Sequence, residues 1–179
     1  MKVTSDLHVH TNLSLCGDPD ATVEGYLSAC REAGITTIGF SNHCWVGDMP
    51  LNCYIADWYR VQTLDRALSL RNQIPDDTKG IKVLVGCETE YIGNGIIGMD
   101  KDAAELFDYV LVPMSHFDKP GFVVPADLAS GGARAVSELL YRYFYEIVTL
   151  GIATGVPHPF VPFGFFDKIP ICTMLLIPI

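Results

Sequence analysis

Short apolar segments alternate with helical segments along this chain, and this alternation limits the possible folds more than any other feature. The apolar segments that we expect to form strands are residues 2–8, 35–40, 81–85, 108–113 and 152–156. The helices expected between them are residues 21–33, 56–72, 101–107 and a long segment after Gly131-Gly132. Because strands that alternate with helices form parallel sheets, we expect a single-domain α/β fold.

The longer helical segments each have an apolar face, which we expect to pack against the sheet. These faces are Tyr26, Leu27, Cys30 and Ala33 in the first helix, Val61, Leu64 and Leu68 in the second, and Val136, Leu139, Leu140, Tyr143, Phe144, Ile147 and Val148 in the last. Thr22 and Gly34 are expected to cap the first helix. Charged residues lie four apart on the other face of the last helix, at Arg134, Glu138, Arg142 and Glu146. We interpret them as a solvated charge ladder and not as a phosphate-binding site.

All five histidines of the chain lie at the ends of predicted strands. They are His8, His10, His43, His116 and His158, and Glu88 is placed in the same way. The carboxyl ends of parallel strands meet at one edge, so we expect these side chains to lie together. His8 and His10 point to the same face if their segment is extended. Nitrogen ligands with a bridging carboxylate suit a site of two or three Zn, Mn or Fe ions.

Each of these residues also has an explanation that involves no metal. A His-x-His pair can arise by chance, and His43 or His116 can be an ordinary loop histidine. Glu88 and Glu90 can be solvated carboxylates. The metal interpretation is favoured because five imidazoles and a carboxylate recur together at strand ends, which separate accidents do not explain.

The overall composition limits the partners of the protein. With 12 basic and 21 acidic residues the formal charge is -9, which argues against long-range attraction to nucleic acid or to an anionic membrane but leaves a local basic patch open. The six cysteines show no C-x-x-C spacing and no secretory signal precedes the first strand, so we expect free thiols and a cytoplasmic location. The longest apolar run, residues 169–179, is shorter than a spanning helix, so no membrane segment is expected.

Five separated motifs of the chain resemble those of a known family. They are Asp6-Leu7-His8-Val9-His10-Thr11, Ser41-Asn42-His43, Gly86-Cys87-Glu88, Ser115-His116 and His158-Pro159-Phe160. In this order and spacing they resemble the PHP (polymerase and histidinol phosphatase) family. The resemblance implies a distorted TIM-like (β/α)7 barrel with a trinuclear metal site and phosphoesterase activity.

The resemblance also implies a role for each motif residue. His8 and His10 would bind the first metal, Glu88 would bridge the first and second, His116 and His158 would complete the second, and His43 would serve the third. Asp6, Ser115 and Asp118 are candidates for hydrogen bonds that orient the imidazoles. Glu88, which follows Gly86-Cys87 as in the family motif, and not Glu90, is expected to be the ligand. Replacing Glu90 by glutamine is therefore expected to leave bound metal nearly unchanged.

The chain departs from the family pattern in two places. Where many members have a further histidine after the His-x-His, this chain has Cys16, whose thiolate can bind zinc or whose thiol can be a spectator. The family's last motif, an Asp-x-His, has no counterpart after His158. We therefore expect residues 1–162 to be an incomplete PHP domain of about five βα units, and residues 163–179 to be an atypical apolar tail.

The expected function is hydrolysis of a small phosphate monoester, similar to the histidinol phosphatase reaction of histidine biosynthesis, by metal-activated water. Because the last motif is missing, we expect fewer than three tight metal sites and weak activity. One alternative is a metal-binding fragment that does not turn over substrate. Another is a PHP nuclease, which the acidic charge balance disfavours.

Overall fold

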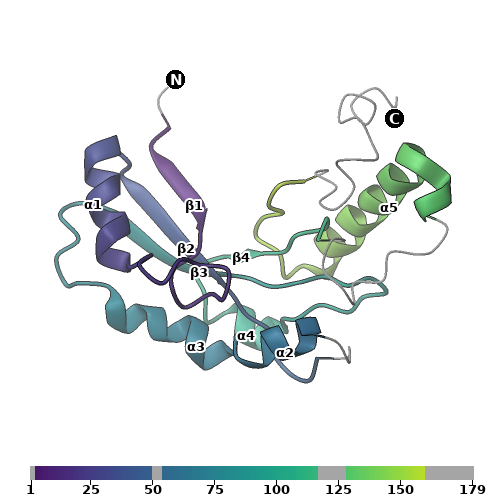
Figure 1. Cartoon of the computed structure of the whole chain (residues 1–179), viewed down its shortest axis with the longest axis horizontal. Coiled ribbons are helices and arrows are strands. Elements are labelled where there is room, and N and C mark those ends of the chain that lie inside the picture. Colours follow the sequence, from purple (N-terminus) through teal and green to yellow (C-terminus); the bar gives the residue numbers. More distant parts are fainter. Residues whose placement is uncertain (1–2, 50–53, 117–127, 160–179) are drawn as a thin grey trace.

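The computed structural model describes residues 3–49, 54–116 and 128–159 of the chain. Its strands are β1 (Ser5–Val9), β2 (Thr37–His43), β3 (Lys82–Glu88) and β4 (Val110–Leu111). They form one parallel sheet in the order β1-β2-β3-β4. The sheet is curled like part of a TIM-type barrel (Figure 1). The predicted α/β class with a parallel sheet is confirmed, and the described strands form an open sheet.

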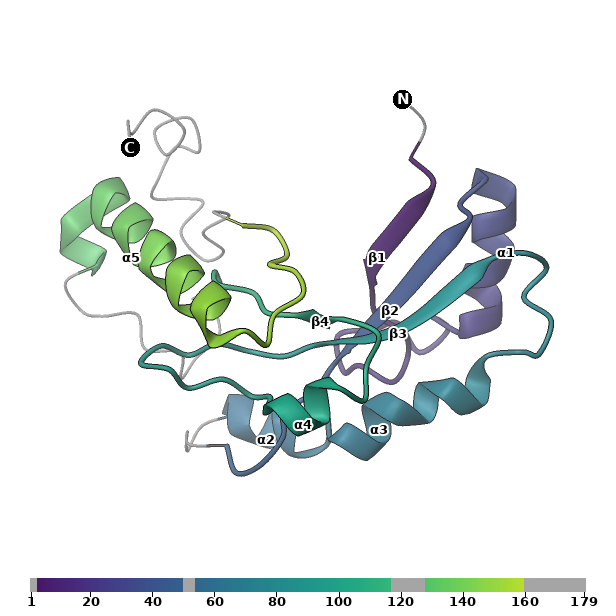
Figure 2. The same cartoon turned by 180° about the vertical axis from the view of Figure 1, so that it is seen from behind.

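Six helical segments accompany the sheet within the described residues. They are α1 (Val23–Ala33), α2 (Tyr54–Arg60), α3 (Leu64–Leu68), the 3-10 helix η1 (Ser69–Gln73), α4 (Lys101–Ala104) and α5 (Leu128–Leu150). Seen from behind, α1, α3 and α4 lie along the outer side of the curled sheet, while α5 lies at the far end from β1 (Figure 2). No helix in the described part of the chain is long and apolar enough to cross a membrane.

Helix α1 has both of the predicted caps. The Thr22 side chain accepts a hydrogen bond from Gly25 N at 3.2 Å, and Gly34 adopts the left-handed conformation with φ of 72°. Leu27 and Cys30 are buried as expected. Ala33, which was expected to be buried, is exposed, because it lies in the last turn beyond the edge of the core.

The helix predicted over residues 56–72 is wrong in its continuity, because the chain breaks between α2 and α3. The Thr63 side chain caps α3 by accepting a hydrogen bond from Arg66 N at 3.3 Å. Gln62 O accepts a hydrogen bond from Trp45 N at 3.0 Å, so the break connects this segment to the chain after β2. Val61, expected to point inward, is 48% exposed as a result.

The last predicted helix also differs from its expected limits. Helix α5 begins at Leu128, so Gly131-Gly132 lie inside it and do not precede it. Val148 is 55% exposed, although it was expected to belong to the buried face. Arg134 Nε donates to Glu138 at 2.8 Å on the surface, in agreement with a charge ladder.

One residue of the expected charge ladder has a partner outside the ladder. Glu146 is only partly exposed and accepts a hydrogen bond from the Tyr91 hydroxyl.

The last predicted strand is reduced to a bridge. Residues 152–156 make a single parallel bridge, between Leu111 and Gly155, with Val112 N donating to Gly155 O at 3.0 Å. This segment therefore lies beside β4 in the position of a fifth strand.

A close contact in the core sets the position of β3, the strand that ends at Glu88. The Tyr109 ring packs against Gly39 and Gly86, and a Cβ at Gly86 would lie 2.4 Å from it. The Tyr109 hydroxyl donates to Leu7 O at 2.8 Å, which links the ring to β1. Replacing Gly86 by alanine is expected to lower the free energy of unfolding by about 1–3 kcal/mol, because the ring must move. Urea denaturation measures this change.

A variant that lacks the Tyr109 ring tests whether this ring causes the cost of Gly86→Ala. Tyr109→Leu shortens the side chain that Gly86 contacts, so Gly86→Ala should cost less free energy in that variant than in the parent protein. An equal cost in both backgrounds would show that the Tyr109 ring is not the reason for the glycine.

Candidate metal centre

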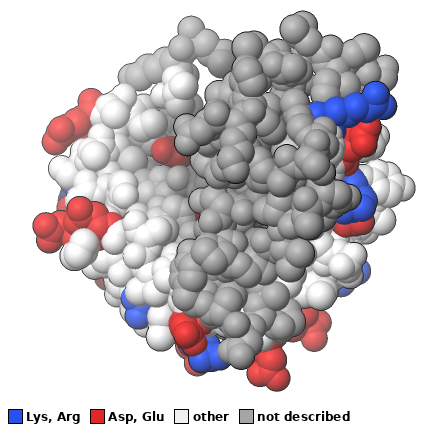
Figure 3. Space-filling model, turned by 45° about the vertical axis from the view of Figure 1, so that its right-hand side comes forward, with Lys and Arg blue, Asp and Glu red and all other residues white. Residues whose placement is uncertain are grey.

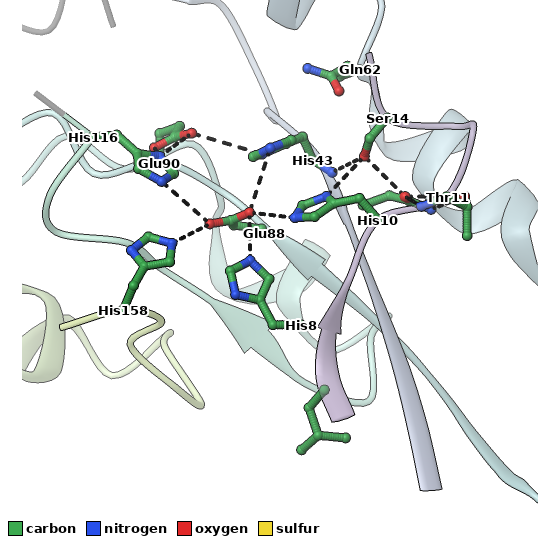
Figure 4. A network of polar contacts seen from close by, with 12 residues as sticks. His8, His10, Thr11, Ser14, His43, Gln62, Glu88, Glu90, His116 and His158 are labelled. Atoms are coloured by element: carbon green, nitrogen blue, oxygen red, sulfur yellow. Dashed lines mark hydrogen bonds and ion pairs between the residues drawn. The ribbon is translucent and has the colours of Figure 1, made fainter. Parts of the chain in front are cut away.

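The structure brings the five imidazoles and the Glu88 carboxylate together at the carboxyl edge of the sheet (Figure 4). His8 lies in β1 and His10 follows that strand, while His43 and Glu88 are the last residues of β2 and β3. His43 and Glu88 are direct partners in the parallel register. His116 follows β4, and His158 follows the bridge at Gly155. The predicted meeting of strand-end side chains is confirmed.

Glu88 is the centre of this cluster. It is 1% exposed. Its Oε2 atom lies 3.2, 3.0 and 3.6 Å from the Nε2 atoms of His8, His10 and His43. Its Oε1 atom lies 3.9 and 3.6 Å from the Nε2 atoms of His116 and His158. The two oxygens of one carboxylate thus face two separate groups of imidazoles, the arrangement that a bridging ligand requires.

The electrostatics of the cluster favour an ionised Glu88. Burial alone would raise the pKa of Glu88, but its contacts with His10, His158 and His8 lower this pKa well below the usual value. Burial likewise would lower the pKa of His10, yet its contacts with Cys16 and Glu88 raise this pKa to about 9. Without metal, the cluster therefore contains a carboxylate that is balanced by a protonated imidazole.

The donor atoms fit divalent metal ions. Two ligand atoms that each lie about 2 Å from a tetrahedral zinc ion are about 3.3 Å apart, close to the separations around Glu88. Within the described residues, Glu88 Oε1 is buried and has no hydrogen-bond partner. In the part of the chain that the structure describes, three groups have donor atoms within 4.8 Å of one another: His8, His10 and Glu88; Glu88, His116 and His158; and His10, Cys16 and His43. A bound cation would satisfy Glu88 Oε1.

A second buried carboxylate, Glu90, lies next to the cluster and contacts the imidazole of His116. Its oxygens lie 3.0 and 2.8 Å from His116 Nδ1, and it accepts a hydrogen bond of 2.5 Å from the Tyr59 hydroxyl. The same hydroxyl lies 3.3 Å from His43 Nδ1. Burial and the neighbouring Glu90 charge raise the pKa of Tyr59 well above its usual value, so the hydroxyl remains a donor. Glu90 therefore orients His116, with its Nε2 toward Glu88.

Glu88 and Glu90 are not solvated carboxylates, since they are 1% and 0% exposed. The sequence contained one signal for Glu90, its spacing of two residues from Glu88 at a strand end. The role of Tyr59 gave no such signal, because this residue comes from a helix that is distant in the sequence.

Ser14 is a further residue that the sequence did not indicate. Its hydroxyl lies 3.3 Å from His10 Nδ1, accepts a hydrogen bond from His43 N at 2.9 Å and donates to Asn42 at 3.0 Å. These contacts connect the first two strands at the centre. Ser14 thus helps to orient the His10 imidazole.

Of the three residues predicted to orient imidazoles, one lies in the expected position. The Ser115 hydroxyl lies 3.3 Å from His158 Nδ1, in the expected position. Asp6 instead accepts a hydrogen bond from the backbone N of His8 at 3.1 Å, so its contact is with the backbone of this strand. Asp118 lies outside the described residues.

Metal binding is expected to release a proton near neutral pH. His10, with a pKa of about 9, is protonated at pH 7.5 in the metal-free protein, whereas an imidazole ligand must be neutral. Zinc titration calorimetry in buffers of different ionisation enthalpy measures the release, and the affinity should fall as the pH is lowered below about 9. A binding enthalpy that does not depend on the buffer would contradict this expectation.

The sequence matches the PHP domain family over residues 6–169, which is most of the chain. The chain belongs to the PHP domain family. This PHP domain is also similar to a protein named probable histidinol-phosphatase from Deinococcus radiodurans, with 26% identity over 181 residues. The alignment covers 93% of this chain and 65% of the relative, so the chain spans just under two thirds of that protein.

Proposed function

We propose that this PHP domain is a metal-dependent phosphoesterase that hydrolyses a small phosphate monoester, as the name of its Deinococcus relative suggests. The observation that carries the proposal is the single buried Glu88 carboxylate with imidazole nitrogens on both of its oxygens. Membership of the PHP domain family supports the proposal, because PHP domains are metal-dependent. Two or three Zn, Mn or Fe ions are the cofactors that such ligands suit.

The proposed ligand sets follow the three donor groups. His8, His10 and Glu88 hold the first ion, and Glu88, His116 and His158 hold the second. His43 serves the third, with Cys16 beside it. Glu90, Ser14 and Ser115 contact the Nδ1 atoms of imidazoles whose Nε2 atoms face Glu88.

The reaction needs a nucleophile near neutral pH and positive charge beside the phosphoryl oxygens. When bound, the ions supply both, by activating water and by neutralising charge on the phosphate. The protein residues keep the imidazoles oriented, and Glu88 remains ionised because its pKa is lowered. In this scheme no side chain forms a covalent bond with phosphorus.

The surface charges of the described residues favour a small substrate over nucleic acid. On the face shown in Figure 3, Lys and Arg side chains are scattered, and most lie beside acidic side chains. Four basic residues form ion pairs with acidic neighbours: Arg31 with Glu24, Arg60 with Asp57, Lys79 with Asp77, and Arg134 with Glu138. Such pairs reduce the positive charge that could attract phosphodiester backbones.

Two assays test the proposed function. Phosphate release from small monoesters, histidinol phosphate included, is measured beside degradation of single-stranded DNA, both with added Zn²⁺ or Mn²⁺. We expect release from at least one monoester and none of the DNA degradation that a nuclease would show. Metal binding without either activity would identify the chain as a metal-binding domain without turnover, and DNA degradation alone would identify a nuclease.

A further inference from the structure

The third donor group differs from the other two because it contains a thiol. Cys16 lies within 4.8 Å of donor atoms of His10 and His43, and these two rings are stacked with centroids 4.6 Å apart. Cys16 is exposed and lines a pocket of about 370 Å³ together with His8, His10 and Tyr26. The thiol is therefore both next to the imidazoles and accessible to an ion from solvent.

The loop that contains Cys16 is held from inside by Asn42. The Asn42 Oδ1 atom accepts hydrogen bonds from Thr11 N at 2.8 Å and from the Ser14 hydroxyl at 3.0 Å. The turn is closed by Gly17 N, which donates to Ser14 O at 3.0 Å. A Cβ at Gly17 would lie 2.1 Å from Thr11 O, so the turn has room only for glycine.

Two further side chains form hydrogen bonds with the same loop. Gln62 Oε1 accepts a hydrogen bond from Leu15 N at 3.1 Å, and Arg66 Nε donates to Leu13 O at 2.6 Å. Gln62 lies in the break between α2 and α3, and Arg66 lies in α3. Because three separate parts of the chain position this loop, the proximity of Cys16 to the imidazoles is a built feature of the fold.

The other cysteines of the described residues do not share this environment. Cys30, Cys44 and Cys87 belong to the buried apolar core. Burial raises the pKa of the Cys44 thiol to about 12 and also raises that of Cys87. These thiols are packing residues, whereas Cys16 faces two nitrogen donors.

We infer that Cys16 and His43, beside His10, form a nitrogen–thiolate position that selects zinc and other thiophilic ions over manganese. The inference rests on the proposed metal-dependent function and adds the identity of one ion. Thiolate ligands favour zinc and similar ions, while manganese favours oxygen ligands. A coordinated thiol is deprotonated by the ion itself. The two Glu88 groups, which have only nitrogen and oxygen donors, lack this selectivity.

Cobalt substitution tests the inference without an activity assay. Co²⁺ bound by a thiolate gives an intense sulfur-to-cobalt charge-transfer band in the near ultraviolet, whereas nitrogen and oxygen ligands alone give only weak visible bands. We expect the band in the parent protein, and its loss in Cys16→Ser with the visible bands retained. Cys30→Ala is the matched control, since this cysteine belongs to the buried apolar core, and it should retain the band.

Metal competition provides the second readout. In equal Zn²⁺ and Mn²⁺, Cys16→Ser should lose bound zinc measured by elemental analysis, and Cys16→His should bind metal but lack the cobalt band. A band that persists in Cys16→Ser, or weak visible bands without any charge-transfer band in the parent protein, would overturn the inference and leave the proposed function intact. Absence of all cobalt binding would overturn both.

Discussion

Replacing Glu88 by glutamine is expected to remove most of the metal that the protein binds. Glu88 belongs to two of the three donor groups, and its oxygens face imidazoles on both sides. The substitution preserves the shape of the side chain but removes the negative charge and one metal-binding oxygen. We expect metal affinity to fall by more than the roughly 10–100-fold that the loss of an outer partner costs. Titration with zinc, followed by elemental analysis, measures the loss.

Glu90→Gln is the matched control for this substitution. The sequence alone predicts that this substitution leaves bound metal nearly unchanged, but Glu90 contacts His116 Nδ1 at 2.8 Å and accepts the Tyr59 hydrogen bond. We now expect a loss of about 10–100-fold, the range for residues that orient a ligand. Tyr59→Phe should have a smaller effect, because Glu90 keeps its contact with His116. Equal losses in Glu88→Gln and Glu90→Gln would show that Glu88 has no special role as a ligand.

The cluster of donors was predictable because it depends on simple periodic structure. A parallel sheet places the ends of its strands at one edge, and the apolar segments before His43 and Glu88 were long enough to recognise as strands. The pairing of His43 with Glu88 in the register then follows from the order of the strands. His8 and His10 share a face for the same reason, since a strand has a period of two.

Ser115 was predicted to contact an imidazole, but Ser14, Tyr59 and Gln62 were not predictable, because they meet their partners through tertiary contacts that leave no local pattern. Tyr59 reaches Glu90 across 31 positions of sequence, and Gln62 reaches the Cys16 loop across 47. The same contact explains the broken helix, since a continuous helix would not place Gln62 beside both Trp45 and Leu15. Apolar periodicity could not reveal this break, because Val61 fits the pattern and is nevertheless exposed.

Removal of metal is expected to abolish phosphatase activity and to lower the melting temperature. In the proposed mechanism the ions provide the activated water and the positive charge, and no described side chain replaces them. An ion present at 100 times its dissociation constant stabilises the folded protein by about 2.7 kcal/mol. For a domain of this size, that corresponds to a shift of about 5–10 °C in the melting temperature.

The measurement compares protein treated with a chelator, the same protein after Zn²⁺ or Mn²⁺ is restored, and Glu88→Gln under both conditions. Restored metal should recover the activity and the melting temperature of the parent protein, but should change neither strongly in Glu88→Gln, since the shared ligand is absent. The variant therefore separates binding at the centre from non-specific effects of the ions. Hydrolysis at the original rate in fully metal-free protein would refute the mechanism. A normal melting temperature together with lost activity would show instead that the ions serve the reaction and contribute little to the stability of the fold, which the buried pair of Glu88 and protonated His10 would then explain.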